Sequence, residues 1–339
     1  MLARVYWETF VTRRDLVRYL AMLIVAYGQR ALPLAERSYC GGSGLTVLKD
    51  LTGQTGEPAA SAAERSALVF PDPTLAYHGY SLHDLTVDGC TAHVVRPKDS
   101  LPARPWVWRT MFWDAFPGVD VALLEAGFHV AFIDVGNTFG CPDAMKHFDA
   151  FYANMRLCGL SAKPALEGLS RGGLYAYRWA YANTDKVGCI YGDAPVCDMK
   201  SWPGGKGNGS GSPEDWKEAI KDYHFADEKE MLRFKGNPID ILEPIAAAHI
   251  PIIHVCGDAD TVVPEDENTD IVRVRYIALG GDFALIVKQG CGHHPHGLAD
   301  PSHVVNFIMA HCAEGEAAKK ALASSPKPGS ILELATGHW

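Results

Sequence analysis

The sequence lacks any run rich in lysine or arginine and carries little positive charge over its 339 residues. Its 31 Lys and Arg are outnumbered by 40 Asp and Glu, which gives a formal net charge of -9 at pH 7. Proteins that bind nucleic acids carry a basic face that neutralises phosphate groups. The charge balance therefore predicts no nucleic-acid partner.

Paired cysteines are also missing. No two of the nine cysteines form a Cys-x-x-Cys pair, and nine is an odd number. A disulfide framework uses cysteines in pairs. Several of the nine fall within segments that are expected to be strands or helices, where a thiol packs as a small apolar group. We therefore expect buried free thiols, which favours a reducing compartment such as the cytoplasm.

The apolar stretch near the N-terminus, residues 19–27, is too short to cross a bilayer, because a spanning helix needs about 20 apolar residues. It comes after Arg13 and Arg14, and in an export signal the apolar region likewise comes after a positively charged N-terminal region. An export signal here would make the protein periplasmic or secreted. The alternative is an amphipathic helix packed on a domain, and the sequence leaves both open.

Three parts are expected along the chain. Residues 1–65 hold the N-terminal helix and a linker rich in Gly, Ser, Thr and Ala, residues 66–312 form the main domain, and residues 313–339 form a peripheral tail. Asp88-Gly89 predicts a hairpin turn. Apolar strands are then expected at 106–109, 129–135, 163–169, 187–191, 251–256 and 283–288, with helices over 119–126, 142–157 and 301–312. This alternation predicts an α/β domain with a mostly parallel sheet covered by helices on both faces.

Residues 198–242 interrupt the alternation with a glycine-rich run followed by a polar helical stretch. They follow a strand at the carboxyl edge of the predicted sheet, where ligands bind in open α/β sheets. We expect a cap over the binding site. The aromatic residues in it are expected to contact substrate: Trp202, Trp216, Tyr223 and Phe225.

Gly168-Leu-Ser170-Arg-Gly172 is a Gly-x-Ser-x-Gly motif between a predicted strand and a predicted helix. Such a serine lies on a sharp turn that exposes its hydroxyl near a helix N-terminus. The hydroxyl needs a base, and the base needs an orienting acid. Two later loops supply both types of residue: Gly257-Asp258-Ala-Asp260, and Gly292-His293-His294-Pro-His296.

In this order, the three motifs resemble the α/β-hydrolase superfamily. Trp106-x-Trp-Arg109, Tyr191-Gly-Asp-Ala-Pro195 and the histidine-rich loop resemble, more narrowly, bacterial α/β hydrolases of the carbohydrate-esterase type. The resemblance implies an α/β-hydrolase fold, an acyl-enzyme mechanism, an acylated or esterified carbohydrate as substrate, and no cofactor. Ser170-Arg171 also resembles the serine-arginine turn of glucuronoyl esterases, but Leu174 stands where that turn continues with lysine.

The resemblance assigns Ser170 as nucleophile, Asp260 as acid and His293 as base. Asp193, at the end of the preceding strand, is the alternative acid, while Asp258 is expected to brace its turn. The oxyanion hole is expected to combine the Arg171 amide with one at Arg109 or Thr110.

Two guanidinium groups, those of Arg109 and Arg171, are expected near the nucleophile. Either they hold the oxyanion or a substrate carboxylate, or they pair with structural carboxylates such as Glu167 or Asp193. The residues expected to bind substrate are Trp113, Trp202, Trp216 and His294.

A metal site is a different interpretation of the clustered histidines, with Asp258 or Asp260 as a further ligand. Adjacent histidines do not easily share one metal ion, and the sequence has no His-x-x-x-His helix, so we expect no catalytic metal. Two other functions stay open: a peptidase of the prolyl-oligopeptidase kind, and a catalytically silent α/β-hydrolase fold that binds ligands or partners. Neither the oligomeric state nor the natural substrate follows from the sequence.

Overall fold

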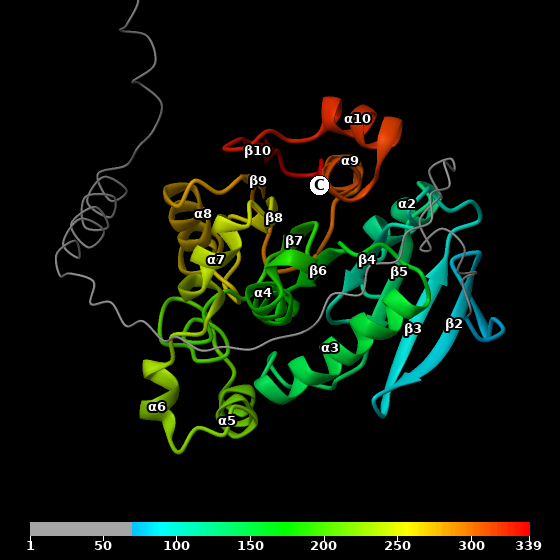
Figure 1. Ribbon diagram of the computed structural model, residues 1–339. Coiled ribbons are helices and arrows are strands. Elements are labelled where there is room, and N and C mark those ends of the chain that lie inside the picture. Colours follow the sequence, from blue (N-terminus) through cyan, green and yellow to red (C-terminus); the bar gives the residue numbers. More distant parts are fainter. Residues whose placement is uncertain (1–69) are drawn as a thin grey trace, which may run out of the picture. The chain divides into compact units, whose positions relative to one another are not determined.

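The computed structural model describes residues 70–339, and the expected N-terminal helix and linker lie outside this part. The sheet runs in the order β1-β2-β3-β5-β4-β6-β7-β8-β9-β10 (Figure 1). The pairs β1–β2, β2–β3 and β3–β5 are antiparallel, and every pair from β5 to β10 is parallel. The strands are β1 (Leu75–Tyr77), β2 (Tyr80–Val87), β3 (Cys90–Arg96), β4 (Trp106–Arg109), β5 (His129–Ile133), β6 (Ala165–Leu169), β7 (Cys189–Asp193), β8 (Ile252–Gly257), β9 (Phe283–Lys288) and β10 (Ile331–Leu334).

Helices cover both faces of the sheet. One buried cluster contains side chains from α3, α4, α7 and α8, and the other contains side chains from α2 and α9. The α-helices are α2 (Gly118–Glu125), α3 (Pro142–Leu157), α4 (Gly172–Ala182), α5 (Pro213–Asp222), α6 (Glu228–Arg233), α7 (Leu242–Ala247), α8 (Thr269–Ala278), α9 (Ser302–Cys312) and α10 (Gly315–Ser324). The expected parallel sheet with two covered faces is confirmed.

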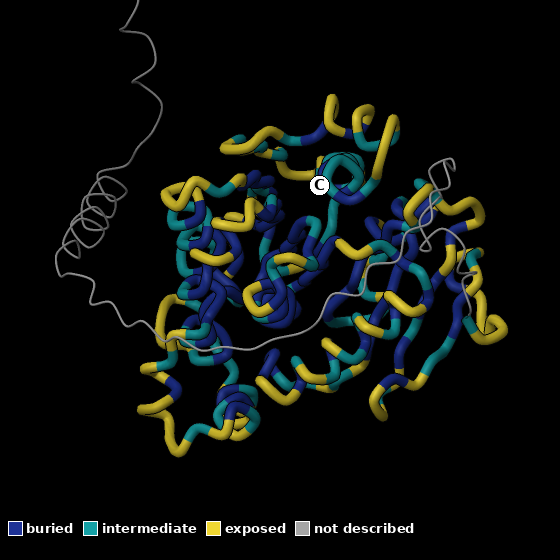
Figure 2. The backbone as a smooth tube through the Cα atoms, in the orientation of Figure 1, coloured by how far each residue is buried: buried dark blue, intermediate teal, exposed yellow. Residues whose placement is uncertain are grey.

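Strand sequences explain this layering. Every residue of β4, β5, β6, β7 and β8 is buried, as expected of strands that have helices on both sides (Figure 2). Trp108 in β4 stacks on Phe148 of α3 with ring centroids 4.8 Å apart. The cysteines at residues 70–339 are free thiols, as expected, and most are buried. None of the described helices combines the length and hydrophobicity that crossing a bilayer requires.

The segment from residue 313, expected as a peripheral tail, joins the folded domain. Helix α10 packs on α9, and β10 pairs parallel to β9 with Ile331 opposite Leu285. The pattern of β10 is half exposed, as at the edge of a sheet, and four residues are too few to stand out in the sequence.

Glu265 opens the short 3-10 helix η4 (Glu265–Glu267) between β8 and α8. Burial, followed by the nearby Asp270 charge, raises the pKa of Glu265 to about 7. The unfolded chain therefore loses this proton first as pH rises, and the folded state loses stability between about pH 4.5 and pH 7. Glu265→Gln removes this cost. We expect the free energy of unfolding of this variant, minus that of the wild type, to be roughly 1–3 kcal/mol higher at about pH 8 than at about pH 4.

Urea denaturation at both pH values measures this difference. Glu243→Gln is the matched control, since Glu243 is exposed in the first turn of α7. Its difference from the wild type should change little with pH. A Glu265→Gln difference that is equally flat would contradict the buried-carboxyl explanation.

Candidate active site

Ser170 occupies the tight turn between β6 and α4. Its φ of +47° lies in the left-handed region, and its amide donates to the Asp193 carbonyl at 2.8 Å. A Cβ on Gly168 would lie 2.8 Å from the Gly172 carbonyl oxygen, and one on Gly173 would lie 2.7 Å from a Pro195 side-chain carbon. Glycine at these positions is what lets the strand and the helix approach this closely, as the motif predicts.

A chain of hydrogen bonds joins the three residues that the motifs single out. The Ser170 Oγ lies 2.9 Å from the His293 Nε2, and the His293 Nδ1 lies 2.7 Å from the Asp260 Oδ2. The tautomer with hydrogen on Nδ1 donates to Asp260 and leaves Nε2 to accept the serine proton. Ser170 follows β6, Asp260 follows β8 and His293 follows β9, so the carboxyl ends of three strands bring the residues together.

The charge of Asp260 is stabilised by its own turn. Burial alone would raise the pKa of this carboxyl, but hydrogen bonds from His293 and from two backbone amides outweigh burial and lower it. Those amides, of Val262 and Val263, donate to the Asp260 Oδ1 at 2.8 and 2.9 Å. Asp260 is therefore ionised at neutral pH and can stabilise a positive charge on His293.

Asp193, the alternative acid, orients a different histidine. Its Oδ1 lies 2.7 Å from the His296 Nδ1, and its Oδ2 accepts from the Gly297 amide at 2.8 Å and the Tyr191 hydroxyl at 2.6 Å. Asp258, expected to brace its turn, accepts from the Gly290 amide at 2.6 Å. Of these carboxylates, Asp260 alone is hydrogen-bonded to His293 in the part of the chain that the structure describes.

No known family model matches the sequence, and comparison with curated proteins finds no match. Among solved structures, the chain is similar to a Bacteroides ovatus protein assigned as a dipeptidyl aminopeptidase IV, with 15% identity and a TM-score of 0.51 over 68% of this chain and 35% of that chain. It is also similar to the acylaminoacyl peptidase of Pyrococcus horikoshii, with 14% identity and a TM-score of 0.49 over 65% of this chain and 40% of that one. The chain spans 35–40% of the length of these two proteins.

The sheet order, the strand-to-helix turn at Ser170 and the structural match together decide the fold. The chain has the α/β-hydrolase fold.

In this α/β-hydrolase fold, two backbone amides near Ser170 are candidates for an oxyanion hole. The Arg171 amide directly follows the nucleophile, and the Met111 amide lies beside the start of α4, 3.8 Å from where a Cβ on Gly172 would be. Within residues 70–339, neither N–H group donates to another residue. The expected second donor is wrong, because the Thr110 amide already donates to the Glu167 carbonyl at 2.9 Å.

Arg109 is fully buried, so its guanidinium does not serve the oxyanion, and the alternative role, pairing with a structural carboxylate such as Glu167, is confirmed. Its guanidinium forms ion pairs with Asp120 at 2.7 Å and with Glu167 at 3.1 Å. Burial raises the pKa of Glu167, although the Arg109 charge lowers it, and the Asp120 charge raises it further. Arg109 of β4 is therefore the cation shared by a buried carboxyl of α2 and a buried carboxyl of β6.

Arg109→Met leaves those two carboxyl groups buried without their cation. We expect the free energy of unfolding to fall by about 3–5 kcal/mol, measured by urea denaturation at pH 7. Arg273→Met is the control, since Arg273 forms a partly exposed pair with Asp270 and its removal should cost less than about 1 kcal/mol. Equal losses in the two variants would contradict the structural role of the buried pair.

Arg171 reaches toward the cap and pairs with a carboxylate, as one of its two expected roles requires, but the partner is neither Glu167 nor Asp193. Its Nη1 donates to Asn137 and lies 3.2 Å from the Asp215 Oδ1, and Asp215 belongs to the first turn of α5. The guanidinium also lies 4.9 Å from the centre of the Trp202 ring. Asp215 is separated from Arg171 by 44 residues, and no sequence motif links them.

The cap packs more tightly than its sequence suggests. The Trp216 indole nitrogen donates to Glu228 at 3.1 Å, and the Tyr223 ring stacks on Phe225 with centroids 5.5 Å apart. These side chains belong to a buried cluster and not to the cavity at Ser170. The expectation that Trp216, Tyr223 and Phe225 contact substrate is therefore wrong, whereas Trp202 does line the cavity.

A cavity of about 260 Å³ opens above Ser170. It is lined by Phe112, Ala115, Phe116, Leu169, Ser170, Arg171, Trp202, Val262, His293, His294 and His296. Trp113, expected here, instead packs on Tyr77 with ring centroids 5.0 Å apart. Its neighbours Phe112 and Phe116 line the cavity in its place. The sequence predicted that the loop after β4 contributes an aromatic ring to the site, but no pattern in it indicates which rings face the cavity.

Proposed function

We propose that this protein is a serine hydrolase that cleaves carboxylic esters through an acyl-enzyme. The observation that carries the proposal is the hydrogen-bonded chain from Ser170 through His293 to Asp260 at the base of a cavity. A binding protein of the same fold needs no nucleophile, base and acid within hydrogen-bond distance of one another.

The proposed reaction starts with transfer of the Ser170 proton to the His293 Nε2 as Oγ attacks the ester carbonyl carbon. The carbonyl π electrons move to the oxygen, and the Arg171 and Met111 amides donate hydrogen bonds to it. When the tetrahedral intermediate collapses, the alcohol leaves with the proton from His293. Water then attacks the acyl-enzyme and loses its proton to His293, and collapse of the second tetrahedral intermediate returns that proton to the Ser170 Oγ as the acid is released.

An acylated or esterified carbohydrate is the substrate that we propose. A cavity of about 260 Å³ suits a short acyl group or a sugar ring better than a long acyl chain. Trp202 offers an indole at the cavity wall, and the exposed His294 imidazole offers hydrogen-bonding nitrogens to hydroxyl groups. The resemblance of its sequence motifs to carbohydrate esterases supports the same class.

A peptidase is the second candidate. The structural neighbour with a TM-score of 0.51 is assigned as a dipeptidyl aminopeptidase IV, and the acyl-enzyme chemistry serves amides as well as esters. Peptide cleavage differs in requiring protonation of an amine leaving group, for which His293 is placed equally well.

A substrate panel distinguishes the candidates. The full chain is assayed against acetylated sugars, methyl uronates, short p-nitrophenyl esters and prolyl or acylaminoacyl p-nitroanilides. We expect kcat/KM for an acetylated sugar to exceed that for every anilide by at least about 100-fold. Faster cleavage of a peptide anilide would favour the peptidase, and the absence of turnover on the whole panel would contradict both candidates.

A further inference from the structure

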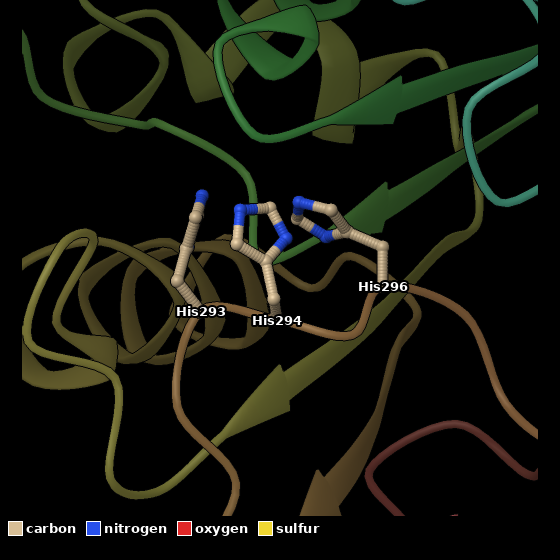
Figure 3. Close-up of side chains that lie close together, drawn as sticks. All are labelled: His293, His294 and His296. Atoms are coloured by element: carbon tan, nitrogen blue, oxygen red, sulfur yellow. The ribbon is translucent and has the colours of Figure 1, made fainter.

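Three histidine rings of one loop lie close together at the cavity, although His293 and His294 are adjacent in the sequence. The ring centroids of His293, His294 and His296 lie 4.9 Å apart in all three pairs (Figure 3). One nitrogen from each ring can be chosen so that all three lie within 4.8 Å of one another. Ester hydrolysis by the mechanism above uses only one of these imidazoles as base, so base catalysis does not account for the close grouping of all three.

Buried carboxylates hold two of the three rings in the same way. The Nδ1 of His293 lies 2.7 Å from Asp260, and the Nδ1 of His296 lies 2.7 Å from Asp193. Each carboxylate accepts the Nδ1 hydrogen and leaves the Nε2 lone pair available, which is how histidine ligands of metal ions are oriented in proteins. His294, the third ring, is exposed and makes no hydrogen bond through its ring within residues 70–339.

We propose that this histidine triangle is a binding site for a divalent transition-metal ion, and that the bound ion inhibits the enzyme. Zn²⁺ suits it best, since imidazole nitrogen is a preferred zinc ligand and three histidines leave a fourth tetrahedral position for water or the Ser170 oxygen. Zinc–nitrogen bonds of about 2.0–2.1 Å bring the ligand nitrogens to about 3.3 Å from one another. Each ring then moves inward by roughly 1 Å.

Inhibition follows from the shared atom. The His293 Nε2 that would bind the ion is the atom that lies 2.9 Å from the Ser170 Oγ. A nitrogen lone pair given to zinc cannot accept a proton, so metal binding and base catalysis exclude each other. Metal binding itself does not depend on the proposed esterase function, whereas inhibition rests on it.

The test uses the full chain carrying Ser170→Ala, freed of metal with EDTA and then dialysed. Zn²⁺ alone is titrated by calorimetry, and Co²⁺ alone is titrated by its visible absorption. We expect one equivalent of each ion to bind, with the absorption of tetrahedral cobalt and displacement of Co²⁺ by Zn²⁺. His294→Asn in the same background should weaken binding at least about tenfold, and because His294 is exposed it should leave the fold intact.

Two further variants sharpen the result. Asp193→Asn removes the negative charge that holds the His296 Nδ1 hydrogen and should weaken binding by about 10–100-fold. His303→Gln is the matched control, since His303 lies on α9 outside the triangle, and the affinity should not change. No saturable binding of one Zn²⁺, or equal affinity in the His294→Asn and control proteins, would overturn the proposal.

A final arm links binding to activity. In the protein with Ser170 intact, Zn²⁺ should abolish ester turnover over the concentration range in which it binds, and EDTA should restore it. Full turnover with the site saturated would overturn the inhibitory role. A protein without esterase activity would contradict the proposed function and leave the binding result standing.

Discussion

Ser170→Ala should lower kcat for any hydrolysed ester by about 10⁴–10⁶-fold. The Ser170 Oγ is the only group that the proposed reaction attaches to substrate, and its proton is the one that His293 removes at 2.9 Å. Truncation leaves the two amides and the cavity in place, so some rate above the uncatalysed reaction should persist. Steady-state kinetics with a short p-nitrophenyl ester measures the loss.

The fold should survive this change. Ser170 holds a left-handed backbone conformation at φ +47°, which alanine tolerates about as poorly as serine does, so the strain changes little. Ser100→Ala is the control, since Ser100 is exposed and does not line the cavity at Ser170, and this variant should keep the wild-type rate. Residual activity of a few per cent in pure Ser170→Ala protein would show that another group is the nucleophile.

Asp260→Asn should lower kcat by about 10⁴-fold while changing KM little. An amide at this position can donate to the His293 Nδ1, which favours the tautomer that carries its hydrogen on Nε2. That tautomer cannot accept the Ser170 proton. The amide also fails to stabilise the imidazolium that forms during the reaction.

Asp193→Asn is the comparison that distinguishes the two acids. Burial would raise the pKa of Asp193, but the His296 hydrogen bond and charge outweigh burial and lower it, so this carboxylate is also ionised. It contacts His296 and not His293, and we expect a loss of about tenfold or less in kcat. A larger loss for Asp193→Asn than for Asp260→Asn would assign the acid to the end of β7.

The sequence predicted the elements that are long, apolar and bounded by strong signals. Helix α3 begins at Pro142 and ends at Leu157 as its pattern predicts, and the hairpin turns at Asp88-Gly89 between β2 and β3. Residues whose position follows from the end of a strand were also accessible to prediction. Ser170, Asp260 and His293 each come directly after or shortly after a strand of the parallel sheet, so their proximity follows from the sheet order.

Contacts that depend on how a side chain turns were not predictable. Phe112, Trp113 and Phe116 lie in one loop, and only the folded backbone decides that Trp113 packs inward while the other two line the cavity. The ion pair of Arg171 with Asp215 depends on how the cap docks, which no local pattern records. The Thr110 amide is engaged because it continues the hydrogen-bonded pairing of β4 with β6 by one bond beyond Arg109, to the Glu167 carbonyl.

The most direct test of the central claim is covalent labelling with a fluorophosphonate, which reacts with a serine that an adjacent base activates. The full chain is treated with the reagent, digested and mapped by mass spectrometry. The account predicts one adduct per chain on Ser170, strongly reduced in Asp260→Asn and absent in Ser170→Ala. No adduct, or an adduct on another residue, would contradict a nucleophile at this turn.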